Sequence, residues 1–228
     1  MGRDGPRAPA DPPAAADLIR RHAVVARPPL CPEIALRLIT ATTPLFRGNE
    51  AAAEAAGLPW PFWGFAWPGG QALARYVLDH PCLFRGNRVL DFGAGCGIAG
   101  IAAAMAGARE VLASDVDPTA AAAIEINARA NGRQIEVTTR DLIGEQGDWD
   151  VVLVGDMFYD DELAHACVPW LEELARRGAR ILLGDPGRGF LDADRLEPLE
   201  RYDAPADNDA DGTRRVRTTV YAWRPRPR

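Results

Sequence analysis

The sequence predicts an α/β protein built on a doubly wound, mostly parallel sheet. Three observations favour this class. β-rich runs alternate with helical stretches between residues 88 and 187, which is the pattern of βαβ units. The run at 149–158, WDVVLVGDMF, is almost continuously apolar, as expected of a strand buried on both faces. An aspartate closes each of five predicted strands, at the edge where open parallel sheets bind ligands.

The elements can be assigned in chain order. Strands are expected at 88–94, 110–116, 135–141, 149–158 and 180–187. Helices are expected at 97–106, 118–131 and 161–177, with Pro169 kinking the last of them. A late strand at 214–225 alternates Arg with Thr and is expected to be antiparallel and near an edge. Residues 191–213 fit a strand, a loop or part of an acceptor groove.

The N-terminal region divides from the main domain at residue 61. Residues 1–16 are rich in Pro and Ala and are predicted to be a disordered tail. Residues 17–60 are predicted to be a helical segment, with short helices at 18–26 and from Pro32 onward. The main domain is then expected to occupy residues 61–228.

Composition excludes several classes of protein. The 228 residues are 47% hydrophobic and 25% charged, typical of a globular domain. The net charge of −6 argues against nucleic-acid binding. Four dispersed Cys and three His predict no metal site. The chain has no long apolar run and no signal-peptide pattern, so we expect no membrane span and a cytoplasmic location. All 26 basic residues are Arg, a coding bias that suggests a bacterial source.

The turn after the first strand, DFGAGCGIAG, fits two ligands. Gly95, Gly97 and Gly100 form the GxGxxG of a dinucleotide site, with Asp115 where a ribose acceptor belongs. Alternatively, Asp91 precedes three alternate glycines. A pyrophosphate favours N–H donors and is repelled by a carboxylate, whereas the ammonium and sulfonium of S-adenosylmethionine are attracted by one. The electrostatics of Asp91 therefore favour S-adenosylmethionine.

The motifs DFGAGCG, SDVDP and TRDL resemble the signature regions of seven-β-strand, Rossmann-like class I S-adenosylmethionine-dependent methyltransferases. The resemblance runs from about residue 60 to 190. It implies that Asp91, Gly93, Gly95 and Gly97 surround the methionine end of the donor. It also implies a contact of Asp115 with the ribose, Asp141 and Leu142 beside the adenine, and Gly155 below the sulfonium.

A narrower resemblance rests on three further blocks, PFWGFAWPGGQALARYVLDHP, GDMFYDDELA and LLGDPGR. Together they are similar to the lysine methyltransferases of the electron transfer flavoprotein β subunit. Bacterial members imply a ribosomal stalk protein as a second substrate. The wider group carries Asp-x-x-Tyr after the fourth strand, here Asp156 to Tyr159. The resemblance makes Asp156 and Tyr159 the catalytic candidates.

The aromatic block before the first strand is expected to form a wall of the donor pocket. The helix after it can cross the carboxyl edge of the sheet, so that Trp67 covers the donor and Gln71, one turn on, faces the same way. Trp63, Phe158 and Asp185 are assigned to the acceptor side. Packing onto the core is the alternative for the two Trp residues, and a buried core position is the alternative for Tyr159.

The expected reaction is direct methyl transfer to a neutral lysine amine of a protein substrate. A free lysine has a pKa of about 10.4, so the site must favour loss of the proton. Asp156 can bind the incoming ammonium, but its charge also raises the pKa of the amine, and the sequence leaves the balance open. A small-molecule N-methyltransferase and an NAD-dependent oxidoreductase are the competing functions.

Overall fold

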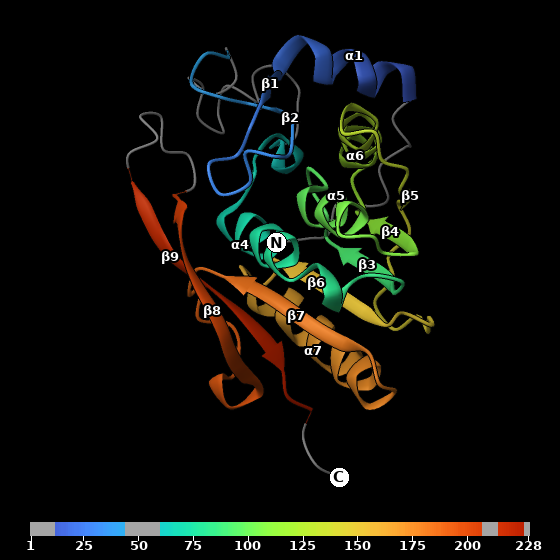
Figure 1. The fold of residues 1–228 in the computed structure, drawn as a ribbon, viewed down its shortest axis with the longest axis vertical. Helices are drawn as coiled ribbons and strands as arrows, with labels where there is room; N and C mark the ends of the chain where they lie inside the picture. The colour runs from blue at the N-terminus through green and yellow to red at the C-terminus, as the bar shows by residue number, and fades with distance from the viewer. Residues whose placement is uncertain (1–11, 44–59, 207–213, 226–228) are drawn as a thin grey trace.

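The computed structural model describes residues 12–43, 60–206 and 214–225. Its main sheet has seven strands in the order β5-β4-β3-β6-β7-β9-β8 (Figure 1). The five predicted strands are parallel: β3 (Arg88–Phe92), β4 (Glu110–Ser114), β5 (Glu136–Thr138), β6 (Val151–Gly155) and β7 (Arg180–Asp185). The predicted fold class, a mostly parallel doubly wound sheet, is confirmed.

The late strand β9 (Arg215–Trp223) is antiparallel to β7, as predicted. It is not the edge itself, because β8 (Leu196–Pro205) pairs along its outer side. Residues 191–206 thus hold a strand, preceded by a 3-10 turn, η3 (Ala193–Arg195).

Chain order explains where a ligand can bind. From β3 the chain moves outward to β4 and β5, and then returns to β6 beside β3 and continues to β7. The direction of winding therefore reverses between β3 and β6. In open α/β sheets such a reversal leaves a crevice at the carboxyl ends of the strands.

Two hydrophobic cores cover the two faces of the sheet, because alternate residues of a strand point to opposite faces. Val89, Leu153 and Leu182 pack with α4 (Pro68–Asp79) and α5 (Ile98–Met105). Leu90 and Val152 pack on the other face with α7 (Asp161–Arg176). Figure 1 shows α4, α5 and α6 (Pro118–Ala130) on one side of the sheet and α7 on the other.

The helices predicted after residue 61 all form, and their starts follow from the sequence. Asp117 and Asp160 cap α6 and α7 by accepting hydrogen bonds from the backbone N–H groups of Thr119 and Leu163. Pro68 and Pro118 occupy the first turns of α4 and α6, where a missing N–H costs nothing. The helix α7 continues through Pro169 as one element.

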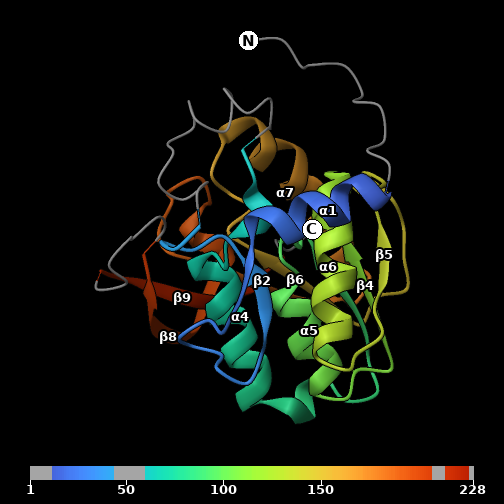
Figure 2. The same cartoon turned by 90° about the horizontal axis from the view of Figure 1, so that it is seen from above.

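The N-terminal region differs from its prediction. Helix α1 spans Pro12–His22, so residues 12–16 are helical and not disordered. The reason is burial: Ala15 and Ile19 are buried, and Ile19 shares an apolar cluster with Ala120 and Ala123 of α6. Figure 2 shows α1 lying across α6. Residues 1–11 lie outside the described part of the chain.

The second predicted N-terminal helix is a strand. Residues 24–26 and 36–38 form a small antiparallel sheet of β1 (Val24–Ala26) and β2 (Leu36–Leu38). Alternation decides the outcome, since Leu36 and Leu38 are buried and Arg37 between them is not. The segment 17–43 is therefore only partly helical, and residues 44–59 lie outside the described residues.

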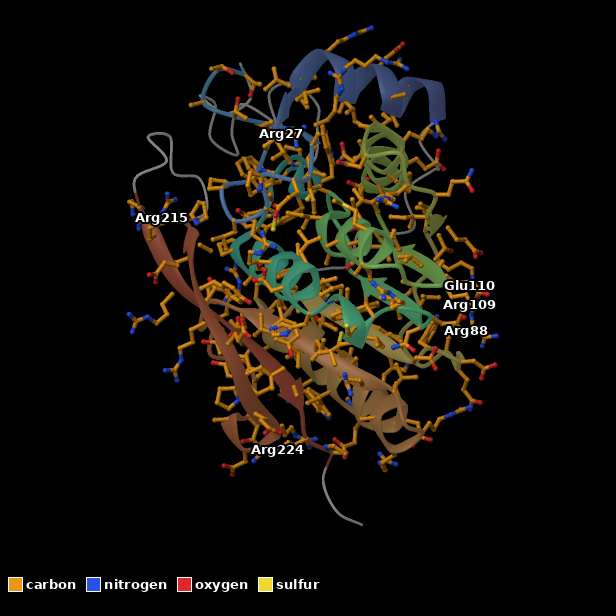
Figure 3. All side chains as sticks on the ribbon, in the orientation of Figure 1. Arg27, Arg88, Arg109, Glu110, Arg215 and Arg224 are labelled. Atoms are coloured by element: carbon orange, nitrogen blue, oxygen red, sulfur yellow. The ribbon has the colours of Figure 1, made fainter. Side chains whose placement is uncertain are left out.

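A cluster of charged side chains lies at the edge of the sheet opposite its carboxyl edge. At the amino ends of β3 and β4, Arg88 and Arg109 pair with Glu110 at 3.4 and 3.7 Å, and the three side chains project together in Figure 3. Arg27, Arg215 and Arg224 are likewise peripheral. Within the described residues, no helix is both long and apolar enough to span a bilayer.

Replacing Asn127 by Ala should destabilise the protein by about 2–3 kcal/mol, because it leaves buried polar groups unpaired. Asn127 is fully buried; it accepts a hydrogen bond from the Arg37 N–H at 2.7 Å and donates one to the Cys96 carbonyl at 2.9 Å. It thus ties the N-terminal region to the glycine-rich turn. Urea denaturation measures the loss. The exposed control on the same helix, Glu125→Ala, should change stability by less than about 0.5 kcal/mol.

Candidate active site

A cavity of about 550 Å³ lies at the carboxyl ends of β3, β4 and β6. Its volume is within the range of about 300–1,000 Å³ typical of small-molecule sites. The lining combines aromatic rings with acidic side chains and glycine backbone. It consists of Phe62, Trp63, Trp67, Phe92, Gly93, Gly95, Ser114, Asp115, Val116, Asp117, Ala120, Asp141, Ile143, Gly155, Asp156, Met157, Tyr159, Leu163 and Arg188.

The turn after β3 requires glycine for steric reasons. Gly93 has φ +66°, and a Cβ atom there would overlap the sulfur of Met157. The N–H of Gly95 points away from the turn and donates to Asp115 Oδ2 at 2.8 Å. The turn therefore holds the Asp115 carboxylate through the Gly95 N–H. Because Gly93 and Gly95 have no side chains, the backbone of the turn lines the cavity directly.

Asp115 is held so that it still has hydrogen-bonding capacity. Each of its oxygens accepts one backbone hydrogen bond, from Gly95 and, at 3.0 Å, from Asp117. A carboxylate has about four acceptor positions, so two remain for a ligand. Burial raises the pKa of Asp115 above its usual value. Such a group suits a pair of hydroxyl donors, as in a ribose.

Asp91 lies deeper, against a small pocket that adjoins the cavity and shares Trp67, Gly93 and Gly95 with it. The carboxyl group is buried and accepts a hydrogen bond from the Gly100 N–H at 2.7 Å. Burial raises its pKa to about 7, against the opposing effect of that hydrogen bond. A cation nearby would lower this pKa and be stabilised in return.

Asp156 has its hydrogen-bonding capacity filled by protein groups. Its Oδ2 accepts from the N–H groups of Gly69 and Gly70, the latter at 3.1 Å, at the first turn of α4. Its Oδ1 accepts from Nε and Nη2 of Arg188 at 3.2 and 2.6 Å. Four donors occupy the approximately four acceptor positions of a carboxylate. The expectation that Asp156 directly binds the acceptor ammonium therefore does not fit this geometry.

The backbone at Asp156 is also unusual. Its φ of +55° makes it the one non-glycine residue with positive φ in the described part of the chain. Asp tolerates this left-handed conformation better than most residues. The turn directs the carboxylate toward the positive end of the α4 dipole, which stabilises its charge.

Helix α4 comes close enough to touch the sheet backbone. A Cβ atom on Gly69 would overlap the Gly184 carbonyl oxygen, and one on Gly184 would overlap that of Gly69. Gly155, at the end of β6, lies similarly against Gly70. The Pro-Gly-Gly after the aromatic block is thus required for the helix to seat on β6 and β7.

Arg188 comes from the loop after β7. Asp185 closes that strand and accepts backbone hydrogen bonds from Gly187 and Arg188 at 3.1 and 3.3 Å. Asp185 itself is buried and does not line the cavity. These hydrogen bonds fix the loop in which Arg188 lines the cavity.

The aromatic residues form the expected wall. Phe62, in the 3-10 turn η1 (Phe62–Gly64), stacks on Tyr159 with ring centroids 6.1 Å apart and planes 16° apart. Trp67 lies 6.0 Å from Phe62, and its indole N–H donates to the Phe62 carbonyl at 3.0 Å. Tyr159 is half exposed, which rules out the buried core alternative. Trp63 is both buried and part of the lining.

The structure brings together nine of the predicted site residues in the cavity lining and leaves others out. Gln71 is buried in α4 and donates to the Ala66 carbonyl at 2.6 Å. Gly97 caps α5. Leu142 and Phe158 are buried in the core under α7. Neither these four nor Asp185 are among the lining residues.

Sequence reasoning missed several lining residues, chief among them Phe62, Met157, Ile143 and Arg188. Three of the four belong to the blocks that carried the family resemblance. The resemblance therefore marked these segments but assigned no role to these residues. In the loop after β5, Ile143 lines the cavity, whereas its neighbour Leu142 is buried in the core under α7. Arg188 closes the block LLGDPGR, but that block does not show that its side chain pairs with Asp156.

Comparison with known proteins decides the family. The electron transfer flavoprotein beta subunit lysine methyltransferase of Xenopus laevis is 40% identical over 214 residues, covering 91% of this chain and 86% of that protein. The protein of that name from Homo sapiens is 37% identical over 222 residues, covering 94% and 84%. The chain belongs to this family. It is a methyltransferase, and the predicted resemblance is confirmed.

Broader matches agree with the fold. The family profile of ribosomal protein L11 methyltransferase (PrmA) matches residues 72–155. The crystal structure of ribosomal protein L11 methylase from Lactobacillus delbrueckii subsp. bulgaricus superposes with a TM-score of 0.51 at 21% identity, covering 69% of this chain and 80% of that one. At that identity the likeness supports the class I methyltransferase fold alone.

Replacing Asp156 by Ala should lower the free energy of unfolding by about 2–3 kcal/mol, in addition to removing activity. The loss is expected because two N–H groups of α4 and the Arg188 guanidinium lose their acceptor, and because Ala is strained at positive φ. Asp156→Asn keeps an acceptor and tolerates the backbone, so it should lose clearly less. Thermal and urea denaturation of both variants test this. Equal stability of D156A and the parent chain would contradict the assigned contacts.

Proposed function

We propose that the chain is an S-adenosylmethionine-dependent protein-lysine N-methyltransferase whose substrate is the β subunit of electron transfer flavoprotein. The observation that carries the proposal is that the cavity of this family member contains two different groups of lining residues, one suited to a donor and one to a lysine side chain. One group presents Asp115 and bare glycine backbone to a donor. The other presents Phe62, Trp67 and Tyr159 to a long aliphatic side chain.

The residues present fit S-adenosylmethionine. Asp115 retains acceptor positions for the ribose hydroxyls, and Asp91 offers a carboxyl group for the ammonium of the methionine end. We assign Asp141 and Ile143, which line the cavity after β5, to the adenine. When bound, the donor supplies an electrophilic methyl group on a sulfonium.

The protein's own contribution to the chemistry is positioning and exclusion of water. Holding two reacting groups in a productive geometry can contribute about 7–11 kcal/mol. The aromatic wall removes water from around the acceptor nitrogen, which disfavours the charged ammonium. Tyr159, whose phenol pKa is raised by burial, stays protonated at neutral pH and is available as a hydrogen-bond donor.

The competing functions fit less well. Asp91 lies beside the glycine turn, where the pyrophosphate of a dinucleotide would be repelled. A small-molecule methyltransferase needs an enclosed acceptor site, whereas Phe62 and Tyr159 are about half exposed at 51% and 50%. A ribosomal protein is the second candidate substrate, because the L11 methyltransferase of Geobacter sulfurreducens is 42% identical over 78 residues.

A bacterial source and a cytoplasmic location complete the proposal. The lysine-free composition supports the first, although the long matches named above are animal proteins. Fractionation of the native cells, with detection of the chain in the cytosolic fraction, tests the second.

Incubation with methyl-labelled S-adenosylmethionine and purified electron transfer flavoprotein tests the function. We expect label on the β subunit, recovered as methyllysine after hydrolysis. This chain contains no lysine, so methyllysine cannot arise from self-modification. A stalk-protein arm and a metabolite-extract arm run in parallel. Label confined to a metabolite would refute protein methylation, and stabilisation by NAD in place of S-adenosylmethionine would refute methyl transfer.

Affinity for S-adenosylmethionine should fall as the pH drops below about 7, because Asp91 has a pKa of about 7 in the donor-free protein. Above that pH the carboxylate is ionised and attracts the donor ammonium; below it each pH unit should cost about tenfold in Kd. Calorimetry between pH 5.5 and 8.5 measures this.

The matched variants locate the effect. Asp91→Asn should bind weakly with little pH dependence, and Asp141→Asn, at the exposed end of the cavity, should retain the dependence of the parent chain. A pH-independent Kd in the parent chain would remove Asp91 from the donor site.

A further inference from the structure

Arg188 is the one cation among the described residues that line the cavity. Two of its nitrogens contact a single oxygen of Asp156, at 3.2 and 2.6 Å. The pair is well shielded, with the side chains of Arg188 and Asp156 exposed by 23% and 7%. It therefore differs from a surface ion pair, whose charges are screened by water.

The loop geometry keeps Arg188 in the wall. Asp185 holds the backbone N–H of Arg188 at 3.3 Å, while Asp156 holds its guanidinium. Two buried carboxyl groups from neighbouring strands thus fix one arginine from both ends. The backbone hydrogen bonds to Asp185 are enough to form the turn after β7, so the contact of the guanidinium with Asp156 is additional to them.

The charges of the cavity are divided between the two sides of β3. Three acids line one side, Asp115 and Asp117 in the loop after β4 and Asp141 in the loop after β5, and none of them forms an ion pair with another described residue. On the side of β6 and β7 the Asp156–Arg188 pair contributes no net charge. The other titratable groups near this pair are Asp185 on its loop, Tyr159 after β6, and Asp160, which precedes α7.

We propose that Arg188 is a positioning residue that sets the protonation state of the acceptor amine by neutralising Asp156. The inference rests on the proposed function. An uncompensated Asp156 beside the acceptor would favour the ammonium form, which has no lone pair with which to attack. When Arg188 neutralises Asp156, that carboxylate no longer stabilises the ammonium form of the acceptor. The acceptor nitrogen therefore releases its proton to solvent. The N–C bond then forms as the C–S bond of the donor breaks.

The test is the pH profile of kcat at saturating acceptor, which reports groups in the enzyme–substrate complex. In the parent chain kcat should rise with pH as the acceptor amine loses its proton. Arg188→Gln should shift this rise to higher pH by about one unit or more. Turnover should then fall about tenfold near pH 7 and recover above pH 9. Arg188→Lys retains the charge and should restore the position of the rise. Arg140→Gln removes an exposed arginine that pairs with Glu145 and should leave the profile unchanged.

A second readout does not depend on turnover. Binding of the acceptor protein to the complex with S-adenosylhomocysteine, measured by calorimetry in buffers of different ionisation enthalpy, reports proton release. The parent chain should release more protons near pH 7.5 than Arg188→Gln. S-adenosylmethionine affinity should stay within about twofold in all variants, because Arg188 lies across β3 from Asp115.

The outcomes separate this inference from the proposed function. If the parent chain methylates lysine and Arg188→Gln loses activity equally at every pH, or loses none, the inference is wrong and the function stands. Equal proton release by the parent chain and Arg188→Gln would also overturn it. If the parent chain transfers no methyl group to lysine, the proposed function fails and the inference with it.

Discussion

The hydrogen bonds of the Asp156 carboxylate hold the active-site end of the molecule together. One oxygen binds the first turn of α4, and the other binds Arg188 from the loop after β7. The glycines at 69, 155 and 184 permit this contact, because a methyl group at 69 or 184 would overlap backbone and one at 155 would crowd α4. The aromatic segment preceding α4 is positioned by the same contact. The shape of the acceptor side thus depends on a charge satisfied entirely by protein donors.

The two halves of the cavity have different structural origins. The half around Asp115 follows from the sheet itself: parallel strands end at one edge, and the turns after β3 and β4 place Gly95 and Asp115 in contact. The half around Tyr159 requires parts distant in sequence, with Phe62 stacking on Tyr159 and Asp156 pairing with Arg188. This division explains why the fold recurs at 21% identity, whereas the family is recognised over most of the chain.

The alternation of strands and helices was sufficient to predict the parallel sheet and its late antiparallel strand from the sequence. It was insufficient where tertiary contacts decide. The strand around Leu36 also pairs its backbone with the buried Asn127 of α6, a tertiary contact that local propensity does not reveal. Residues 12–16 are helical because α6 offers an apolar face. The pairing of Asp156 was not predictable, because its partner Arg188 is 32 residues away in a loop.

The aromatic wall gives the protein an optical reporter of its own. Two of its six tryptophans, Trp63 and Trp67, line the cavity, and the indole of Trp67 is held by a hydrogen bond to the Phe62 carbonyl. Indole emission responds to the polarity around the ring, so a cationic ligand entering the cavity changes the signal. Occupancy can therefore be followed by intrinsic fluorescence in the unlabelled, unmodified chain.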